Sequence, residues 1–445
     1  MERNGSIGFG LEKLPRIVRG QGSYLIDASG RRYLDGSGGP AAFSIGHGNA
    51  EVNAAIGAQL ERIACAYRYL FTSEALEELT DLLLHRAGAD FEHVVYTSSG
   101  SEAVESAMKI ALQYCDARGL AAKRHFIARD RSYHGNTLGA LSVSGFAERR
   151  RPFEGSLLDV SFVSAANAYR PPDGIGAAVL VPHLAAELDA HIRAIGAERV
   201  AAFLMEPVVG AAGGVVPAPP GYAAAVAEVC RRHGVLLLAD EVMCGAGRCG
   251  TWRALEHDGV RPDIMTVAKG LAGGYIPIGA AIFRREIGAT IIAKHGAFMT
   301  GHTYSGHTAA CAAALAVQRL IEREDLIDRV RDRGPRLLAA LRERLERIEA
   351  VGDVRGRGYL IGVEFVRDRS SKEPFDPRRA VGQAVARHAF ADGLIVYPCA
   401  GNAGGGRGDT LIVAPPYNAS DAELEELIDK LGAAVEATFA TELGR

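Results

Sequence analysis

Short apolar runs alternate with segments of helical periodicity between residues 94 and 283. The runs that predict strands are 94–96, 126–128, 179–181, 200–205, 235–239, 264–267 and 279–283. Helical patterns lie between several of them, for example at 103–118 and 222–233. Because the runs are apolar throughout, they are typical of strands that are covered on both faces. The alternation predicts an α/β domain with a mostly parallel central sheet.

The segments before this region predict a β-hairpin and two helices. Residues 23–27 and 31–34 flank the turn Ala28-Ser29-Gly30, which is the pattern of a hairpin. Helical periodicity follows at 51–63 and again at 73–85.

After residue 320 the chain predicts a smaller α+β domain. A long charged helix at 326–349 is followed by strand and helix patterns at 359–366, 379–391, 394–397 and 410–413. Ser420 and Glu423 have the spacing of a capping box and predict the start of a last helix. We therefore expect an N-terminal segment (1–62) that contributes to the small domain, a large domain (63–322) and a C-terminal small domain (323–445).

The charge balance argues against binding to nucleic acid or membranes. The chain has 445 residues, and its 50 basic and 53 acidic side chains leave a net charge of −3. This charge gives no long-range field that would attract nucleic acid or anionic lipid. The apolar runs are far shorter than the roughly 18–20 residues that span a bilayer. We also expect no signal peptide, because charged residues and glycines follow Met1.

The cysteines predict a reduced, cytoplasmic protein. Seven cysteines are scattered along the chain, and an odd number does not suggest a disulfide framework. A metal site would need a closer pattern of ligands than these residues offer. No CxxC or HxxxH spacing accompanies the candidate ligands Cys230, His233, Cys244, Cys249 and His257, so we expect no metal.

Polar residues with chemical potential follow five of the predicted strands. In an open α/β sheet, ligands bind beyond the carboxyl ends of the strands. There the sequence places a serine- and glycine-rich turn, an aromatic side chain, carboxylates and one lysine, which together suit a phosphorylated aromatic aldehyde. The segments are 97–102, 132–135, Glu206-Pro207, Asp240-Glu241-Val242 and Ala268-Lys269-Gly270.

Each of these features also has an ordinary structural interpretation. The Ser99-Gly100-Ser101 turn at a helix N-terminus suits a phosphate, but Ser99 and Glu102 are also the pattern of a capping box. Asp240 suits a protonated pyridine nitrogen, but a salt bridge or a helix cap would also satisfy its carboxylate. The turn lacks the GxxxxGK[ST] pattern, which argues against a nucleoside triphosphate.

Lys269 and Tyr133 have two interpretations as well. Desolvation of Lys269 at a strand end would lower its pKa and suit a Schiff base, whereas most lysines lie on the surface. Tyr133 suits stacking on a flat ring, whereas most aromatic side chains pack in the core.

Taken together and in this order, the motifs closely resemble the class III pyridoxal-phosphate-dependent aminotransferases, the omega-aminotransferase family. The resemblance covers nearly the whole chain, and the spacing between Asp240 and Lys269 is also similar to that of the family. The matching motifs are 33–36, 46–48, 99–103, 133–135, Glu206-Pro207, 240–242, Gly247-Arg248, Lys269-Gly270, 303–307 and 414–416.

The resemblance implies pyridoxal-phosphate fold type I, as in aspartate aminotransferase, and a role for each matching residue. Lys269 would be the Schiff-base lysine and proton shuttle, and Asp240 would hold the pyridinium N–H. The other residues implied to bind the cofactor are Gly100 and Ser101 at the phosphate, Val242 and Tyr133 at the two ring faces, His134 from the same motif, and Glu206 near the phenolic side.

Two further roles concern the partner subunit and the substrate. Thr303 matches the threonine that reaches the phosphate from the neighbouring subunit, which implies a homodimer with shared active sites. Whether two dimers form a tetramer is left open. Arg407 is the candidate for binding a substrate carboxylate, although a solvated loop arginine is the alternative.

The chain departs from the family pattern at two places. Residues 37–42, Ser-Gly-Gly-Pro-Ala-Ala, replace a bulky aromatic that many amine-accepting members carry, which predicts a small pocket wall. Residues 401–408 predict an unusually glycine-rich loop, which leaves the position of Arg407 open. Both departures concern the substrate and leave the cofactor chemistry unchanged.

The resemblance implies a ping-pong transfer of an amino group from an amine or omega-amino acid to a keto acid, pyruvate or 2-oxoglutarate. An aminomutase, a racemase or a decarboxylating transaminase would direct the same chemistry differently. A catalytically silent protein on this fold is a further alternative, and the presence of both Lys269 and Asp240 argues against it.

Overall fold

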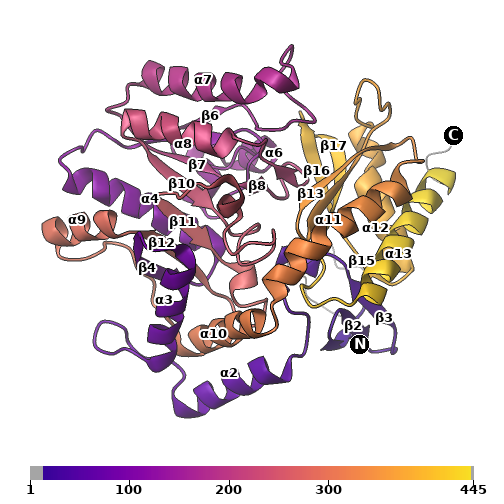
Figure 1. The fold of residues 1–445 in the computed structure, drawn as a ribbon, viewed down its shortest axis with the longest axis horizontal. Helices are drawn as coiled ribbons and strands as arrows, with labels where there is room; N and C mark the ends of the chain where they lie inside the picture. Colours follow the sequence, from indigo (N-terminus) through magenta and orange to yellow (C-terminus); the bar gives the residue numbers. More distant parts are fainter. Residues whose placement is uncertain (1–13, 442–445) are drawn as a thin grey trace.

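The computed structural model describes residues 14–441, and its large domain is built on a seven-stranded sheet (Figure 1). The strands lie in the order β4 (Phe91–Thr97), β12 (Gly279–Arg284), β11 (Ile264–Val267), β10 (Leu236–Asp240), β7 (Val200–Met205), β5 (His125–Arg129) and β6 (Val160–Val163). β12 runs antiparallel to both of its neighbours, and all other neighbouring pairs are parallel. The prediction of a mostly parallel sheet is therefore confirmed.

Helices cover both faces of this sheet, as the apolar runs predict. Phe203 packs with helices on one face, whereas its neighbour Leu204 packs with helices on the other. The first face is covered by α3 (Glu74–Ala87), α7 (Ala177–Ile195), α8 (Tyr222–His233) and α10 (Thr308–Arg323). The second face is covered by α4 (Gly100–Ala117), α5 (Leu138–Ser142) and α9 (Arg285–His295).

Two details of the predicted sheet are wrong. The run 179–181 is part of α7, where Leu180, Leu184, Leu188 and Ile192 form a buried stripe with a four-residue repeat. This helical period extends well beyond the apolar run, and burial of the stripe favours a helix. The edge strand β6 was not predicted, because its four residues include a serine and form no apolar run.

The smaller domain contains a four-stranded antiparallel sheet. Its order is β13 (Val351–Arg357), β14 (Leu360–Phe365), β17 (Arg407–Val413) and β16 (Tyr397–Gly404), and it packs with α11 (Leu326–Leu345), α12 (Val381–Ala391) and α13 (Asp421–Thr441). The glycine-rich segment predicted as a loop is the tip of the β16–β17 hairpin. Ser420 and Glu423 form the expected capping box: each accepts a hydrogen bond from the backbone N–H of the other.

The N-terminal strands pair with the C-terminal part of the chain. A second four-stranded sheet has the order β1 (Ile17–Gln21), β2 (Tyr24–Asp27), β3 (Arg32–Asp35) and β15 (Leu394–Ile395). After the short α1 (Gly38–Ala41), α2 (Ala50–Arg62) packs against α10 of the large domain. The predicted hairpin is thus present, while the domain boundaries at residues 62 and 322 stay a prediction.

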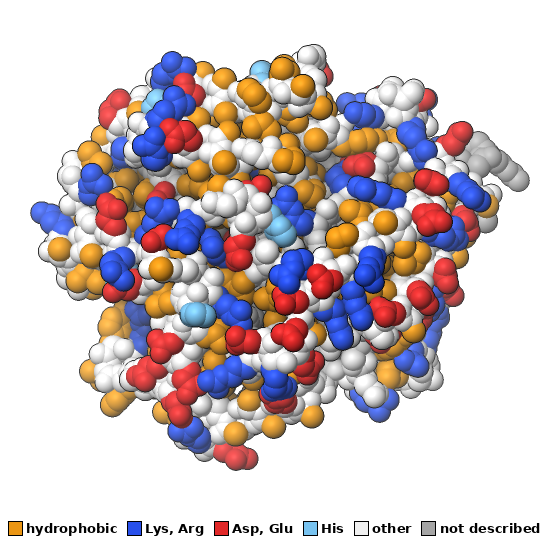
Figure 2. Space-filling view, viewed as in Figure 1, with side chains coloured by type: hydrophobic (Ala, Val, Ile, Leu, Met, Phe, Trp, Pro, Cys, Tyr) orange, Lys and Arg blue, Asp and Glu red, His pale blue; other side chains and the backbone are white. Residues whose placement is uncertain are grey.

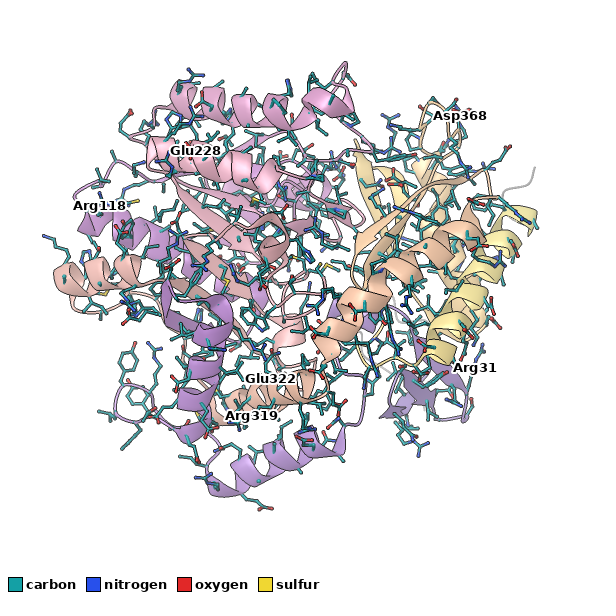
Figure 3. All side chains as sticks on the ribbon, viewed as in Figure 1. Arg31, Arg118, Glu228, Arg319, Glu322 and Asp368 are labelled. Atoms are coloured by element: carbon teal, nitrogen blue, oxygen red, sulfur yellow. The ribbon has the colours of Figure 1, made fainter. Side chains whose placement is uncertain are left out.

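Ion pairs join neighbouring helices at the surface. Arg319 and Glu322 of α10, labelled in Figure 3, pair with Glu78 and Arg86 of α3. Acidic and basic side chains are intermixed over the face shown in Figure 2. No helix within residues 14–441 is long and apolar enough to cross a bilayer. The segment 1–13, which concerns the signal-peptide prediction, lies outside the described residues.

Candidate active site

A cavity of about 500 Å³ lies where the carboxyl ends of five strands meet. β4, β5, β7, β10 and β11 share one direction, since β12 is antiparallel to both β11 and β4. The polar segments that follow these strands therefore reach the same edge of the sheet. Eight of the predicted cofactor residues line the cavity: Gly100, Ser101, Tyr133, His134, Glu206, Asp240, Val242 and Lys269.

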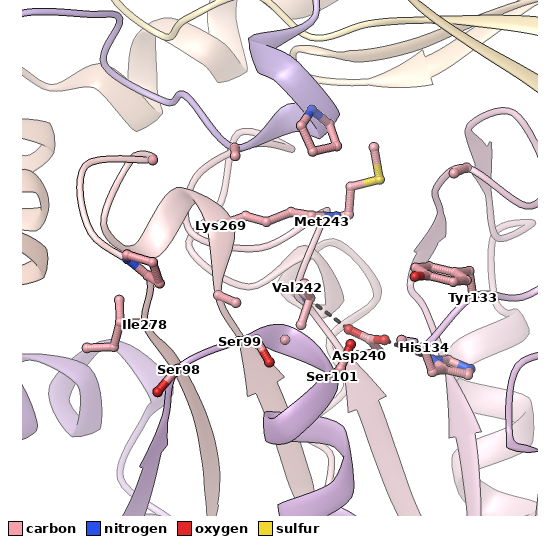
Figure 4. A pocket seen from close by; sticks show the side chains of 18 of the residues that line it. Ser98, Ser99, Ser101, Tyr133, His134, Asp240, Val242, Met243, Lys269 and Ile278 are labelled. Atoms are coloured by element: carbon pink, nitrogen blue, oxygen red, sulfur yellow. Dashed lines mark hydrogen bonds and ion pairs between the residues drawn. The ribbon is translucent and has the colours of Figure 1, made fainter. Parts of the chain in front are cut away.

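Lys269 lies two residues after the end of β11 and extends into the cavity above Val242 (Figure 4). Its φ of 44° lies in the left-handed region, which is unusual for a residue other than glycine. Burial lowers the pKa of its ammonium group, although the nearby Asp240 and Glu206 carboxylates oppose this shift. The fraction of neutral amine is therefore larger for Lys269 than for an exposed lysine. A neutral amine can act as a nucleophile.

Asp240 ends β10, and each of its carboxylate oxygens has a partner. Oδ2 lies 2.8 Å from Nδ1 of His134, and Oδ1 accepts hydrogen bonds from the Val242 N–H (3.0 Å) and the Thr266 hydroxyl (3.3 Å). Figure 4 shows the side chains of Asp240 and His134 side by side. The ring partner of Asp240 is thus a histidine, and the carboxylate still borders the cavity.

Glu206 holds two backbone segments at the cavity wall. Its carboxylate accepts hydrogen bonds from the backbone N–H groups of Tyr133 and Gly210, both at 2.9 Å. Burial raises the pKa of this carboxyl, as does the neighbouring Asp240, while His134 opposes the shift. Because one of these bonds is to the Tyr133 backbone, Glu206 anchors the segment that carries the aromatic ring lining the cavity.

The N-terminus of α4 forms the serine-rich end of the cavity. The Ser99 hydroxyl accepts a hydrogen bond from the Glu102 N–H (3.2 Å), and the Glu102 carboxylate accepts one from the Ser98 N–H (2.7 Å). Ser99 therefore caps the helix, whereas Glu102 bonds to the residue before the cap, so the reciprocal capping box is not complete. Ser98, Ser99, Gly100 and Ser101 also line the cavity. A Cβ at Gly100 would lie 2.8 Å from Cγ1 of Val242, so only glycine lets the helix approach this closely.

Thr303 and Arg407 do not reach this cavity. Thr303 is exposed in the segment between α9 and α10. Arg407 pairs with Gly404 across the hairpin, and its half-exposed guanidinium lies 3.8 Å from the Glu373 carboxylate. The resemblance suggested Arg407 as the residue that binds a substrate carboxylate, whereas in this structure Arg407 lies in the β16–β17 hairpin and outside the cavity.

Three other cavity residues have no motif that would mark them in the sequence. Arg149 comes from the short helix α6 (Ala147–Arg150), Tyr397 from β16, and Phe43 from the segment after α1. The expected small pocket wall is not found, because the ring of Phe43 lies against Gly274. A Cβ at Gly274 would lie 2.2 Å from Cδ1 of Phe43. The aromatic side chain that residues 37–42 lack is thus supplied by the next residue.

The candidate metal ligands do not form a site. Cys230, Cys244 and Cys249 are buried free thiols. Within residues 14–441 no group of three or more His, Cys, Asp or Glu side chains is arranged to hold a metal ion.

The residues around the cavity fit pyridoxal phosphate. The positive end of the 18-residue helix α4 suits the phosphate, and the Asp240 carboxylate suits a protonated ring nitrogen. Lys269 supplies an amine for the aldehyde, while Val242 and Tyr133 offer apolar surfaces to a flat ring. The phosphate, the ring nitrogen and the aldehyde of the cofactor therefore each have a partner of matching chemistry.

Comparison with known proteins agrees with this assignment. The family model for "Aminotransferase class-III" matches residues 12–435. The chain belongs to the class III aminotransferases. An uncharacterized aminotransferase of Bacillus subtilis, YodT, is 43% identical over 93% of both chains. This family membership makes the protein a pyridoxal-phosphate-dependent transferase of amino groups.

Solved structures of transaminases share the fold. An (S)-enantioselective omega-transaminase from Thermomicrobium roseum is 37% identical and superposes with a TM-score of 0.89, covering 96% of this chain and 93% of its own. A PLP-bound amine transaminase from an uncultivated Pseudomonas species is 35% identical with a TM-score of 0.89, covering 99% and 98%. The fold is thus that of the fold type I class III aminotransferases.

Proposed function

We propose that this aminotransferase moves an amino group from an amine or omega-amino acid to a keto acid, pyruvate or 2-oxoglutarate, in two half-reactions that share one cavity. The observation that carries the proposal is that Lys269 and Asp240 border the same cavity at the positive end of α4. Pyridoxal phosphate supplies the aldehyde that takes the amino group and the ring that accepts an electron pair. The protein holds this group in place and moves the protons.

Lys269 is the residue that moves protons. Burial lowers the pKa of its ammonium group, so the amine is more readily neutral than that of a surface lysine. A neutral amine in the cavity removes a proton from the donor carbon and returns it elsewhere on the reacting molecule. The catalytic role of Lys269 is therefore that of a general base and acid.

The remaining residues orient the cofactor. Asp240 keeps a proton on the ring nitrogen, and His134 positions this carboxylate through the 2.8 Å contact. Tyr133, whose backbone is anchored by Glu206, and Val242 would pack against the ring. Gly100 and Ser101 hold the phosphate at the start of α4.

Without a keto acid, the enzyme with bound cofactor is expected to convert one equivalent of donor, because each cofactor accepts one amino group. We expect one equivalent of donor to change the cofactor absorbance, and pyruvate or 2-oxoglutarate to restore it, with one keto acid consumed per donor. Stopped-flow absorbance together with product analysis measures both steps. If the donor is isomerised, or is decarboxylated without an amino group reaching a keto acid, the alternative reaction outcomes are correct and amino transfer is not.

We also propose a cytoplasmic homodimer with shared active sites. The segment 67–71 exposes Tyr67, Tyr69, Leu70 and Phe71, each at least 60% exposed. It adjoins the segment that carries Thr303, because Arg68 donates a hydrogen bond to the Ser305 hydroxyl (3.3 Å). A second copy of the chain is the occupant that would cover this apolar surface. The seven free thiols favour a reducing compartment.

Thr303→Ala is expected to weaken the binding of pyridoxal phosphate about 10-fold, since one hydrogen bond to a charged group contributes about 1.5 kcal/mol or more. Titration of the apoenzyme with cofactor, followed by fluorescence, measures this change. Thr290→Ala, on α9 and outside the cavity, serves as the matched control. Light scattering gives the mass and distinguishes a dimer from a tetramer. A fully active monomer would contradict the shared-site proposal.

A further inference from the structure

Arg149 is a cavity-lining cation that neither the motifs nor the family resemblance assigns to any role. Its guanidinium lies over the ring of Tyr133, 5.1 Å from the ring centroid, and over the ring of Phe146 at 5.3 Å. These contacts hold the planar group against aromatic faces. The side chain therefore has a defined position on the wall of the cavity, beside the ring expected to stack on the cofactor.

Among the ion pairs within residues 14–441, none joins the guanidinium of Arg149 to a carboxylate; its polar neighbour is the uncharged Tyr397 hydroxyl. Its sequence neighbour Glu148 is already engaged: it lies 3.2 Å from the Arg131 guanidinium and accepts a hydrogen bond from the Gly406 N–H at 2.7 Å. Among the cations near the cavity, Arg131 is thus neutralised and Arg149 is not.

The two carboxylates of the cavity do not neutralise Arg149 either. Glu206 accepts the backbone N–H groups of Tyr133 and Gly210, and Asp240 contacts His134, the Val242 N–H and the Thr266 hydroxyl. Both carboxylates are held in these positions by several bonds. The positive charge of Arg149 is therefore available to a ligand that enters the cavity.

The surroundings of Arg149 also indicate where such a ligand would extend. A second cavity of about 270 Å³ shares Arg149, Ala211 and Tyr397 with the main cavity and continues towards Cys399 and Gly401. Arg149 thus lies where the two cavities meet. A substrate with its amino group at Lys269 and its carboxylate at Arg149 has further space beside it.

We propose that Arg149 binds the carboxylate of the amino acid donor and of the keto acid acceptor, so that the enzyme prefers carboxylate-bearing substrates to simple amines. A guanidinium binds a carboxylate through two parallel hydrogen bonds, which fixes the orientation of the substrate as well as its affinity. This inference rests on the proposed function. It assigns to Arg149 the role that the sequence suggested for Arg407.

The test compares each amino acid with the amine that lacks its carboxylate: β-alanine with ethylamine, and 4-aminobutyrate with propylamine. In single-turnover half-reactions of the holoenzyme, Arg149→Gln is expected to raise the half-saturating concentration of the amino acids about 10- to 100-fold. The values for the amines are expected to stay within about twofold. An equal change for acids and amines would show that Arg149 only supports the structure, and would overturn the proposal.

Binding of a non-reacting carboxylate provides a readout that does not depend on turnover. Calorimetry with propionate is expected to show a dissociation constant about 10- to 100-fold higher for Arg149→Gln than for the wild type. Arg150→Gln, on the same short helix but outside both cavities, is the matched control and should bind propionate as the wild type does. Unchanged propionate binding in Arg149→Gln, or a loss in Arg407→Gln instead, would overturn the assignment.

The two readouts distinguish failure of this inference from failure of the proposed function. If no donor changes the cofactor of the wild-type holoenzyme, amino transfer is the part that fails, and the propionate measurement still tests the carboxylate site. If donors react but the preference for acids does not depend on Arg149, the proposed function holds and the role of this arginine is refuted.

Discussion

Lys269→Ala is expected to reduce turnover by about 10⁴-fold or more while the variant still binds pyridoxal phosphate. The substitution removes both the amine that would bond to the cofactor and the group that moves protons during the reaction. The contacts proposed for the phosphate and the ring come from other residues, so cofactor is retained without a covalent bond. Alanine is a better substitute than glycine at this position. Lys269 has a φ of 44°, and glycine would relax this backbone conformation.

Mass spectrometry after borohydride reduction detects the covalent bond between the cofactor and Lys269. The wild type should carry a cofactor adduct on the peptide that contains Lys269, and the variant should carry none. Lys294→Ala, at an exposed position of α9, serves as the control and should keep both adduct and turnover. An adduct on another lysine, or a Lys269→Ala variant that keeps even a few per cent of the wild-type rate, would contradict the assignment.

The residues proposed to bind the cofactor, and shown to line one cavity, could be predicted from the sequence because each follows a recognisable strand. Asp240 is the last residue of β10 and Lys269 lies two residues after β11, and parallel neighbours bring the carboxyl ends of these strands together. Local patterns therefore determine both the element and the end of the element on which these side chains lie. The cavity that contains them follows from the direction of the strands alone.

The residues expected to meet the substrate could not be predicted in this way. Arg149, Tyr397 and Phe43 come from three segments that are far apart in the chain and meet only through the packing of the two domains. Arg149 belongs to a run of three arginines, which in sequence is the pattern of a solvated surface. Arg407 was suggested by the resemblance, and its glycine-rich segment left its position open; in the structure it pairs with Gly404 across the hairpin and does not line the cavity.

Asp240→Asn is expected to leave the fold intact and to lower the rate of amino transfer by about 10³-fold or more. The amide oxygen of asparagine can still accept hydrogen bonds from the Val242 N–H and the Thr266 hydroxyl, so the end of β10 keeps its contacts. An amide carries no charge, however, and does not hold a proton on a ring nitrogen as a carboxylate does. Single-turnover rates with 4-aminobutyrate measure the loss, and thermal unfolding measures the fold.

The matched control is Asp263→Asn. The Asp263 carboxylate accepts a hydrogen bond from the N–H of Leu237 (2.8 Å), and Leu237 lies on the same strand as Asp240. Asp263 itself lies outside the cavity. This control should change stability more than rate.

A further readout separates the effect of the Asp240 charge from an effect on structure. The Asp240 carboxylate raises the pKa of Lys269, so removal of its charge lowers that pKa further. Covalent attachment of cofactor to the apoenzyme should then reach its plateau at a lower pH in Asp240→Asn than in the wild type. A variant with the wild-type rate, or with the wild-type pH dependence of attachment, would show that Asp240 does not act on the cofactor site through its charge.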